Sequence, residues 1–303
     1  MSDGKGGEAD NTSCCACCGI AEIDDIKLVP CDGCGLVRYC GVNCQRDHIS
    51  RHLPACKNRE AVLRDELLLK QPENTHHGDC PICCLPLSLD NRLSGMMSCC
   101  SKLICYGCRY ANNNREVEMG LRQSCPFCRE PVPMTEEFEK RRMKRVEANC
   151  PVAMSFEGIE QYEKGDYQRA FEYWSKAAEL GDALAHYHLA VLYQDGKGVE
   201  KDGGKYVHHL EEAAIGGHPS ARYNLACHEY RHGNIEIAVK HWIIAAKQGH
   251  DGSMKLLMGA FREGNVAKEV LAGALRAHKA AVDAMKSSQR REAVEFYRSI
   301  GVL

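Results

Sequence analysis

The spacing of the cysteines constrains this chain more than any other feature of its sequence. Of the 20 cysteines, 18 lie between Cys14 and Cys128, and most of them form Cys-x2-Cys pairs. Such a pair places two thiolate sulfurs close enough to share one tetrahedral zinc ion. Several pairs followed by further Cys or His residues are typical of structural zinc sites. The two outlying residues, Cys150 and Cys227, are interpreted as ordinary thiols.

A disulfide framework is the alternative to zinc, and it requires an oxidising compartment. Residues 1–13 have no apolar core of the kind found in secretory signals. No stretch approaches the roughly 18 apolar residues of a membrane span. We therefore expect a cytoplasmic or nuclear protein with reduced thiols and no membrane association. The net charge of -2 offers no field that would attract nucleic acid, so no nucleic-acid partner is expected.

The first group of candidate ligands lies within residues 15–56. In chain order they are Cys15, Cys18, Cys31, Cys34, Cys40, Cys44, His52 and Cys56. The run YCGVNCQRDHISRHLPAC closely resembles the signature of the MYND finger. By that resemblance the pairs interleave around two zinc ions. One ion takes Cys15, Cys18, Cys40 and Cys44, and the other takes Cys31, Cys34, His52 and Cys56.

Two alternatives concern the identity of these ligands. Cys14 and Cys17 form a first pair with the same spacing as Cys15 and Cys18. The second choice is preferred because Gly19 follows it, and glycine suits the tight turn that brings backbone N–H groups near the sulfurs. His48 could replace His52 as a ligand, but only His52 has the spacing to Cys56 that the pattern requires.

Zinc replaces a hydrophobic core in so short a segment. Binding is worth roughly 10–16 kcal/mol per structural site. With four protein ligands at each ion, no position remains for a catalytic water, so the segment is expected to bind rather than to catalyse. MYND fingers as a family bind short proline-containing peptides, so the resemblance implies a protein or peptide partner. A helix is expected over residues 57–71, followed by a linker in which His76 and His77 are solvated.

The second group of candidate ligands lies within residues 80–131 and resembles a RING finger in its CPIC, ICYGC and CPFCR runs. By resemblance, one zinc takes Cys80, Cys83, Cys105 and Cys108, and the other takes Cys99, Cys100, Cys125 and Cys128. A common RING finger has a His ligand at the position of Lys102. A lysine side chain is itself a cation and does not serve as an ordinary zinc ligand. Cys99 is the natural substitute, although adjacent cysteines on one ion are geometrically tight. The chain is thus expected to bind about four Zn²⁺ ions.

The RING resemblance also implies a partner. RING ubiquitin ligases dock a ubiquitin-conjugating enzyme on a shallow groove, for which Ile82 and Pro126 are the matching residues here. Arg129 matches the arginine whose planar fork of donors orients the loaded thioester. The alternative is that Ile82 and Pro126 are packing residues and Arg129 a solvated charge. Cys84 is interpreted as a small buried hydrophobe.

The second half of the chain carries an internal repeat. Residues 177–190, 213–226 and 245–258 align, at intervals of 36 and 32 residues. Intervals of this size indicate a solenoid of helix pairs with an extended protein-binding surface. The segment resembles Sel-one-like repeats, a branch of the tetratricopeptide class, in its LYQDGKGVEKD loop. Before the Ala-Ala pairs, Trp174, Leu210 and Trp242 occupy equivalent positions and are expected in the core.

The sequence therefore predicts a multidomain chain, with two small zinc-stabilised fingers followed by an all-α helical-repeat solenoid. The expected parts are a disordered N-terminus (1–13), a MYND-like finger (14–56), a helix and linker (57–79), a RING-like finger (80–131), a solvated charged connector helix (132–153) and repeats (154–303). The function expected first is a RING-type ubiquitin ligase that recruits protein substrates through the repeats and the MYND finger. The alternative is a non-enzymatic, zinc-dependent protein-interaction scaffold.

Overall fold

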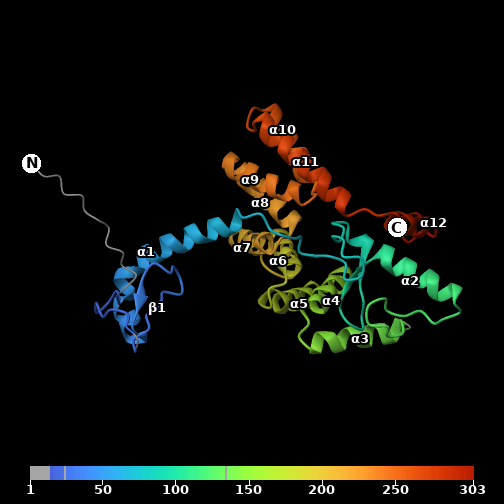
Figure 1. Cartoon of the computed structure of the whole chain (residues 1–303), viewed down its shortest axis with the longest axis horizontal. Coiled ribbons are helices and arrows are strands. Elements are labelled where there is room, and N and C mark those ends of the chain that lie inside the picture. Colours follow the sequence, from blue (N-terminus) through green and yellow to red (C-terminus); the bar gives the residue numbers. More distant parts are fainter. Residues whose placement is uncertain (1–13, 24, 134) are drawn as a thin grey trace, which may run out of the picture. The chain divides into compact units, whose positions relative to one another are not determined.

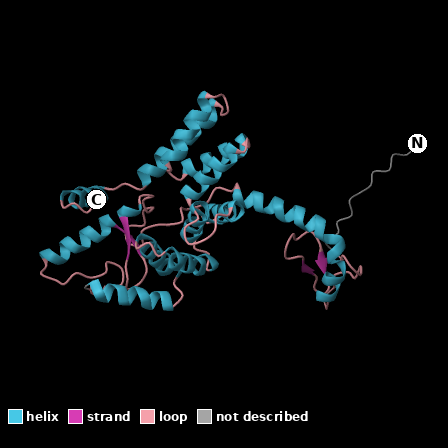
Figure 2. Ribbon diagram, turned by 180° about the vertical axis from the view of Figure 1, so that it is seen from behind, coloured by secondary structure: helices cyan, strands magenta, loops and turns pink. Residues whose placement is uncertain are grey.

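The computed structural model describes residues 14–23, 25–133 and 135–303 of the chain. The predicted disordered segment 1–13 lies outside the described residues. The chain divides into two compact units, Met1–Lys70 and Gln71–Leu303. The predicted fold class is confirmed, because a cysteine-rich region precedes a stack of helices (Figure 1, Figure 2). Within the described residues, no helix has both the length and the apolar character that crossing a bilayer would require.

The first unit is a two-stranded sheet with one long helix. Strands β1 (Val29–Pro30) and β2 (Arg38–Tyr39) are antiparallel, with Val29 opposite Tyr39. Helix α1 (Val42–Leu68) begins well before the helix expected at 57–71. It starts early because His52 and Cys56, one helical turn apart, both face the interior from it. The buried core is made largely of cysteines, together with Leu28 and Tyr39.

The second unit begins with a second small sheet. Strand β3 (Ser94–Met96) follows the short helix η1 (Asn91–Leu93) and pairs antiparallel with β4 (Leu103–Cys105), with Gly95 opposite Ile104. Helix α2 (Tyr106–Glu118) continues directly from β4. The thiol of Cys105 caps this helix by accepting a hydrogen bond from the backbone N–H of Cys108 at 3.4 Å. Apolar burial is small here too, since Leu87, Met97 and Ile104 share the core with cysteines.

The remaining helices are α3 (Thr135–Glu147), α4 (Pro151–Glu163), α5 (Tyr167–Glu179), α6 (Ala183–Asp195), α7 (Gly203–Ile215), α8 (Pro219–Arg231), α9 (Ile235–Lys247), α10 (Asp251–Arg262), α11 (Lys268–Ala284) and α12 (Ser288–Ser299). Helices α4 to α11 form the predicted stack. Helices α4 and α5, α6 and α7, and α8 and α9 pack as close pairs. The Ala-Ala pairs and the large residues before them are buried: Ala177, Ala178, Ala213, Ala214, Ala245, Ala246, Trp174, Leu210 and Trp242. Small residues let two helices approach, and one large side chain fills the groove between them.

The end of the chain departs from the repeat. Helix α11 packs on α9 and α10 and closes the stack, as a terminal repeat requires. Helix α12 instead packs on α2 of the cysteine-rich segment, far earlier in the sequence. Figures 1 and 2 show the two helices side by side.

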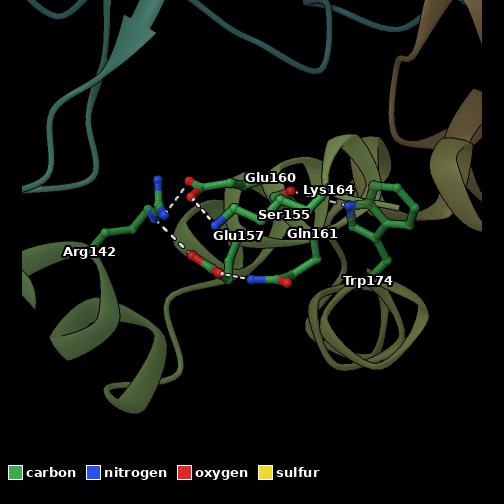
Figure 3. A network of polar contacts seen from close by, with 7 residues as sticks. All are labelled: Arg142, Ser155, Glu157, Glu160, Gln161, Lys164 and Trp174. Carbon is green, nitrogen blue, oxygen red and sulfur yellow. Dashed lines mark hydrogen bonds and ion pairs between the residues drawn. The ribbon is translucent and has the colours of Figure 1, made fainter. Parts of the chain in front are cut away.

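The connector helix α3 joins the cysteine-rich segment to the repeats and is not fully solvated, contrary to the sequence-based expectation. Arg142 is buried and donates from Nε to Glu157 of α4 at 2.9 Å, and it also pairs with Glu160 (Figure 3). Arg145 of the same helix donates to the backbone carbonyl of Cys99. These two arginines tie α3 to α4 and to the cysteine-rich segment, so the basic run has a structural role.

We predict that Arg142→Met lowers the free energy of unfolding by about 3–5 kcal/mol, because it leaves the buried carboxylate of Glu157 without a cation and, among the described residues, with only the amide of Gln161 donating to it. Arg141→Met is the matched control. Arg141 pairs with Glu137 at 3.2 Å near the surface, and such a pair is worth at most about 1 kcal/mol. Urea denaturation followed by circular dichroism measures both. Equal effects of the two variants would contradict the structural role of Arg142.

The linker after α1 is packed against the repeats, so the expectation of solvated His76 and His77 is wrong for His76. The backbone N–H of His76 donates to the carbonyl of Gly217, between α7 and α8, at 3.1 Å. Its imidazole stacks on His218 with ring centroids 4.0 Å apart, and both its ring nitrogens are buried. Burial, reinforced by the neighbouring imidazoles, lowers the pKa of His76 well below its usual value.

His188 of α6 is a second buried imidazole, and it gives the fold a pH dependence. Its ring stacks on Trp174 at 4.4 Å, and burial lowers its pKa to about 4. Below about pH 6.5 the unfolded chain takes up a proton at this position that the folded chain does not. The contribution of His188 to stability is therefore constant above about pH 6.5 and falls as the pH decreases toward about 4.

We predict that His188→Phe makes the repeats less sensitive to acid. The difference in unfolding free energy between about pH 7.5 and about pH 5.5 should shrink by about 1.4 kcal/mol relative to the unmutated chain, because only the one pH unit below about 6.5 contributes. Any loss of zinc in acid is common to both proteins and cancels in the comparison. Urea unfolding at the two pH values measures the effect. An unchanged pH dependence would show that His188 is protonated in the folded state.

Candidate metal centres

Four clusters of cysteine and histidine side chains lie in the two units. Their members are Cys15, Cys18, Cys40 and Cys44; Cys31, Cys34, His52 and Cys56; Cys80, Cys83, Cys105 and Cys108; and Cys99, Cys100, Cys125 and Cys128. Within each cluster the four donor atoms all lie within 4.8 Å of one another. Each cluster joins ligands far apart in the sequence, and the clusters interleave along the chain.

The two clusters of the first unit surround its small sheet. In the first, the sulfur of Cys40 lies 3.5 Å from that of Cys18 and 3.6 Å from that of Cys44. In the second, the sulfurs of Cys31 and Cys56 are 3.7 Å apart. Nε2 of His52 lies 3.1 Å from the sulfur of Cys34.

The sequence left two ligand choices open, namely Cys15 and Cys18 against Cys14 and Cys17, and His52 against His48. Cys15 and Cys18 lie in a cluster of four donor atoms, whereas neither Cys14 nor Cys17 belongs to a cluster among the described residues. His48 is engaged elsewhere, since its Nδ1 lies 3.1 Å from the hydroxyl of Tyr39. Its ring stacks on that of the ligand candidate His52, with centroids 5.9 Å apart.

The clusters of the second unit share the sheet β3–β4. The sulfurs of Cys83 and Cys105 are 3.9 Å apart. In the other cluster, Cys99 lies 3.3 Å from Cys128, and Cys100 lies 3.9 Å from Cys125. Adjacent cysteines thus reach one centre together. Lys102 takes no part, because its ammonium group lies over the ring of Phe127, 5.8 Å from the centroid.

A common backbone turn shapes four of the Cys-x2-Cys ligand pairs, whereas the pair Cys105–Cys108 begins helix α2 instead. In these four pairs the next residue has a positive φ: 74° at Gly19, 67° at Gly35, 54° at Cys84 and 64° at Arg129. Its N–H donates to the carbonyl of the first cysteine of the pair at 2.8–2.9 Å. Glycine adopts this conformation without strain. Cys84 and Arg129 adopt it at a cost, and Cys84 is exposed, so its interpretation as a buried hydrophobe is wrong.

The donor sets fit zinc. A tetrahedral zinc with Zn–S bonds of about 2.3 Å would hold its sulfurs about 3.8 Å apart, close to the spacings found here. Disulfides are excluded by these spacings, since a disulfide requires about 2.05 Å. Burial, and then the neighbouring thiols, raise the pKa of Cys56 to about 12. A bound cation would remove that penalty and hold the ligands as thiolates.

The residues assigned to partner binding lie on the loops of the second unit. Ile82 is 41% exposed, whereas Pro126 is buried. Arg129 is exposed, and its guanidinium donates to the side chain of Asn112 at 2.8 Å. Asn112 was not identified from the sequence. Its signal is its place one helical turn after the ligand Cys108, on the buried face of α2.

Comparison with known families identifies two parts of the chain. The MYND finger family matches residues 15–56. The Sel1 repeat family matches residues 153–182, 183–218 and 219–250, which correspond to the helix pairs α4–α5, α6–α7 and α8–α9 with their connecting turns. The chain therefore contains a MYND finger and three Sel1 repeats, as the resemblances predicted. Modules of both kinds are generally protein-interaction modules.

Individual relatives match parts of the chain. A curated rat (Rattus norvegicus) protein, DAP3-binding cell death enhancer 1, is 38% identical over 56 residues, which are 18% of this chain and 11% of the relative. The Sel1 repeat protein from Oxalobacter formigenes is similar over 64% of this chain and 86% of that one, with 20% identity and a TM-score of 0.43. The Escherichia coli antigen c5321 is similar over 63% of this chain and 40% of its own chain, with 18% identity and a TM-score of 0.37.

We predict that the purified chain binds four zinc ions and that His52→Ala binds three. The substitution removes the only nitrogen donor of its cluster. His48→Ala is the matched control and should retain four ions, because His48 bonds to Tyr39 rather than to a cysteine. Elemental analysis of the three proteins decides the matter. Retention of four ions by His52→Ala, or loss of one by His48→Ala, would contradict the assignment.

Proposed function

We propose that this chain is a zinc-dependent scaffold that binds protein partners through its MYND finger and its Sel1 repeats. The observation that carries this proposal is that each cluster supplies four protein ligands. A catalytic zinc keeps a coordination position for water or substrate, and a closed site stabilises the fold instead. The ions would then hold the shape of surfaces that bind other proteins. We propose the cytoplasm or the nucleus as its location, because free thiols persist there.

The hairpin of the MYND finger offers a surface for a peptide. Val29 in β1 and Leu36 in the turn before β2 are 57% and 47% exposed. Exposed apolar side chains beside a rigid sheet suit a short proline-containing peptide, the ligand class implied by the MYND resemblance. A partner docking here would depend on the two zinc clusters, since they surround the same hairpin.

We predict that the zinc-loaded full chain binds members of a proline-containing peptide library and that Val29→Asp with Leu36→Asp weakens binding at least about tenfold, since a charge is placed in an apolar contact. Fluorescence anisotropy measures the affinity. Val62→Asp, at an exposed apolar position of α1 beyond the ligands, is the matched control and should bind normally. A library without any binder, or equal losses in both variants, would contradict this assignment of the surface.

A ubiquitin ligase is the second candidate, favoured by one observation. The apolar residues Ile82 and Phe127 lie on the two zinc loops of a RING-like segment, and they are 41% and 44% exposed respectively. The burial of Pro126 and the bond from Arg129 to Asn112 weigh against it. We therefore place the scaffold first. A conjugating-enzyme partner rests on the RING resemblance alone.

A discharge assay separates the two candidates. If the chain is a scaffold, it should release ubiquitin from a panel of loaded conjugating enzymes no faster than the enzymes release it alone. A ligase would accelerate release, Ile82→Ala would weaken docking, and Arg129→Ala would slow release with docking intact. Acceleration that is lost in Ile82→Ala at constant zinc content would overturn the scaffold as the whole function.

A further inference from the structure

The last helix of the chain places an arginine against a ligand of the third cluster. Arg290, in the first turn of α12, points into the loop that follows Cys83. Its Nη1 donates to the carbonyls of Pro86 at 2.6 Å and Met285 at 2.7 Å. Its Nη2 donates to the carbonyl of Leu85 at 3.1 Å and lies 3.4 Å from the sulfur of Cys83. One guanidinium thus binds the ligand sulfur and the loop that positions it.

The approach of α12 requires a glycine between two ligands. Gly107 lies between Cys105 and Cys108, and a Cβ atom there would come within 3.0 Å of the backbone of Arg290. Aromatic contacts continue the interface along the two helices. Tyr106 meets Tyr297, and Tyr110 meets Phe296, each with ring centroids 5.0 Å apart. Helix α12 therefore packs directly against the metal-binding segment.

Charge explains what an arginine does at this position. A zinc ion with four thiolates carries a net charge of -2, and this cluster is largely buried. The guanidinium of Arg290 places one positive charge 3.4 Å from the sulfur of Cys83, where it offsets part of this negative charge. A cation that donates a hydrogen bond to a ligand sulfur stabilises the thiolate and fixes its direction.

We propose that Arg290 is a positioning residue for zinc in the cluster Cys80, Cys83, Cys105 and Cys108, and that α12 and this ion hold one another in place. The proposal goes beyond the scaffold function and does not rest on it. The packing of α12 and the binding of zinc are thermodynamically linked, so the coupling is reciprocal. Displacing α12 from α2 weakens zinc binding, and loss of the zinc weakens the packing of α12. The state of α12 would thereby depend on the metal content of a segment whose ligand Cys83 lies 207 residues before Arg290.

The test follows each cysteine separately in the full chain. A zinc chelator is added together with an alkylating reagent, and mass spectrometry gives the alkylation rate of each ligand. We expect Arg290→Ala to accelerate alkylation of this cluster by about 10- to 100-fold, the usual effect of losing a partner that supports a ligand. The other eleven ligand cysteines should keep their rates, which excludes general unfolding.

Two variants sharpen the result. Arg291→Ala changes the neighbouring, exposed arginine of the same helix and should leave all rates unchanged. Arg290→Lys keeps the charge but loses the planar fork, so an intermediate rate is expected. Unchanged alkylation in Arg290→Ala, an equal increase at every cluster, or the unmutated rate in Arg290→Lys would overturn the proposal.

Hydrogen exchange provides the reciprocal readout. In the unmutated chain, chelation should expose the amides of α12 while those of α6 to α9 stay protected. Protection of α12 that survives loss of zinc from its cluster would also overturn the proposal.

Discussion

Four donor atoms within 4.8 Å of one another are the constraint on which the two cysteine-rich segments, from Cys15 to Cys56 and from Cys80 to Cys128, depend. Thiolates so close would repel one another without a cation, and buried thiols resist ionisation. Zinc removes both penalties at once, and its binding energy replaces the hydrophobic core that such short segments lack. The buried residues reflect this directly. In both small sheets the interior consists mainly of ligand cysteines, with few apolar side chains such as Leu28 and Ile104.

The repeats are stabilised differently, by alanines at helix crossings and by large side chains between them. Because the two segments are stabilised in different ways, the contacts that α3 makes with both of them are important. Arg142 reaches Glu157 of the repeats, and Arg145 reaches the backbone of Cys99, a member of the fourth cluster. Helix α12 adds a second connection, because it packs on α2 of the cysteine-rich segment. Within Gln71–Leu303, the metal-binding segment and the helix stack therefore form one compact unit rather than two separate domains.

The features predicted from the sequence depend on local spacing. Ligand pairs, the turn after Cys18, the helix periodicity and the buried Trp174 follow from residues a few positions apart. The features missed depend on contacts between distant segments. No local pattern indicates that Arg142 is buried, that His76 stacks on His218, or that Arg290 reaches Cys83. Cys84 was misjudged for another reason, because its place after a ligand pair sets its backbone conformation and its exposure.

The central claim is that four closed zinc sites organise the cysteine-rich part of the chain, and zinc X-ray absorption spectroscopy tests it most directly. The four clusters contain 15 cysteines and one histidine. The spectrum should therefore fit an average shell of almost four sulfurs at about 2.3 Å, with a minor nitrogen contribution at about 2.0 Å. A shell in which nitrogen or oxygen made up a quarter or more of the ligands would contradict the account, because open or solvent-bound sites would then be present.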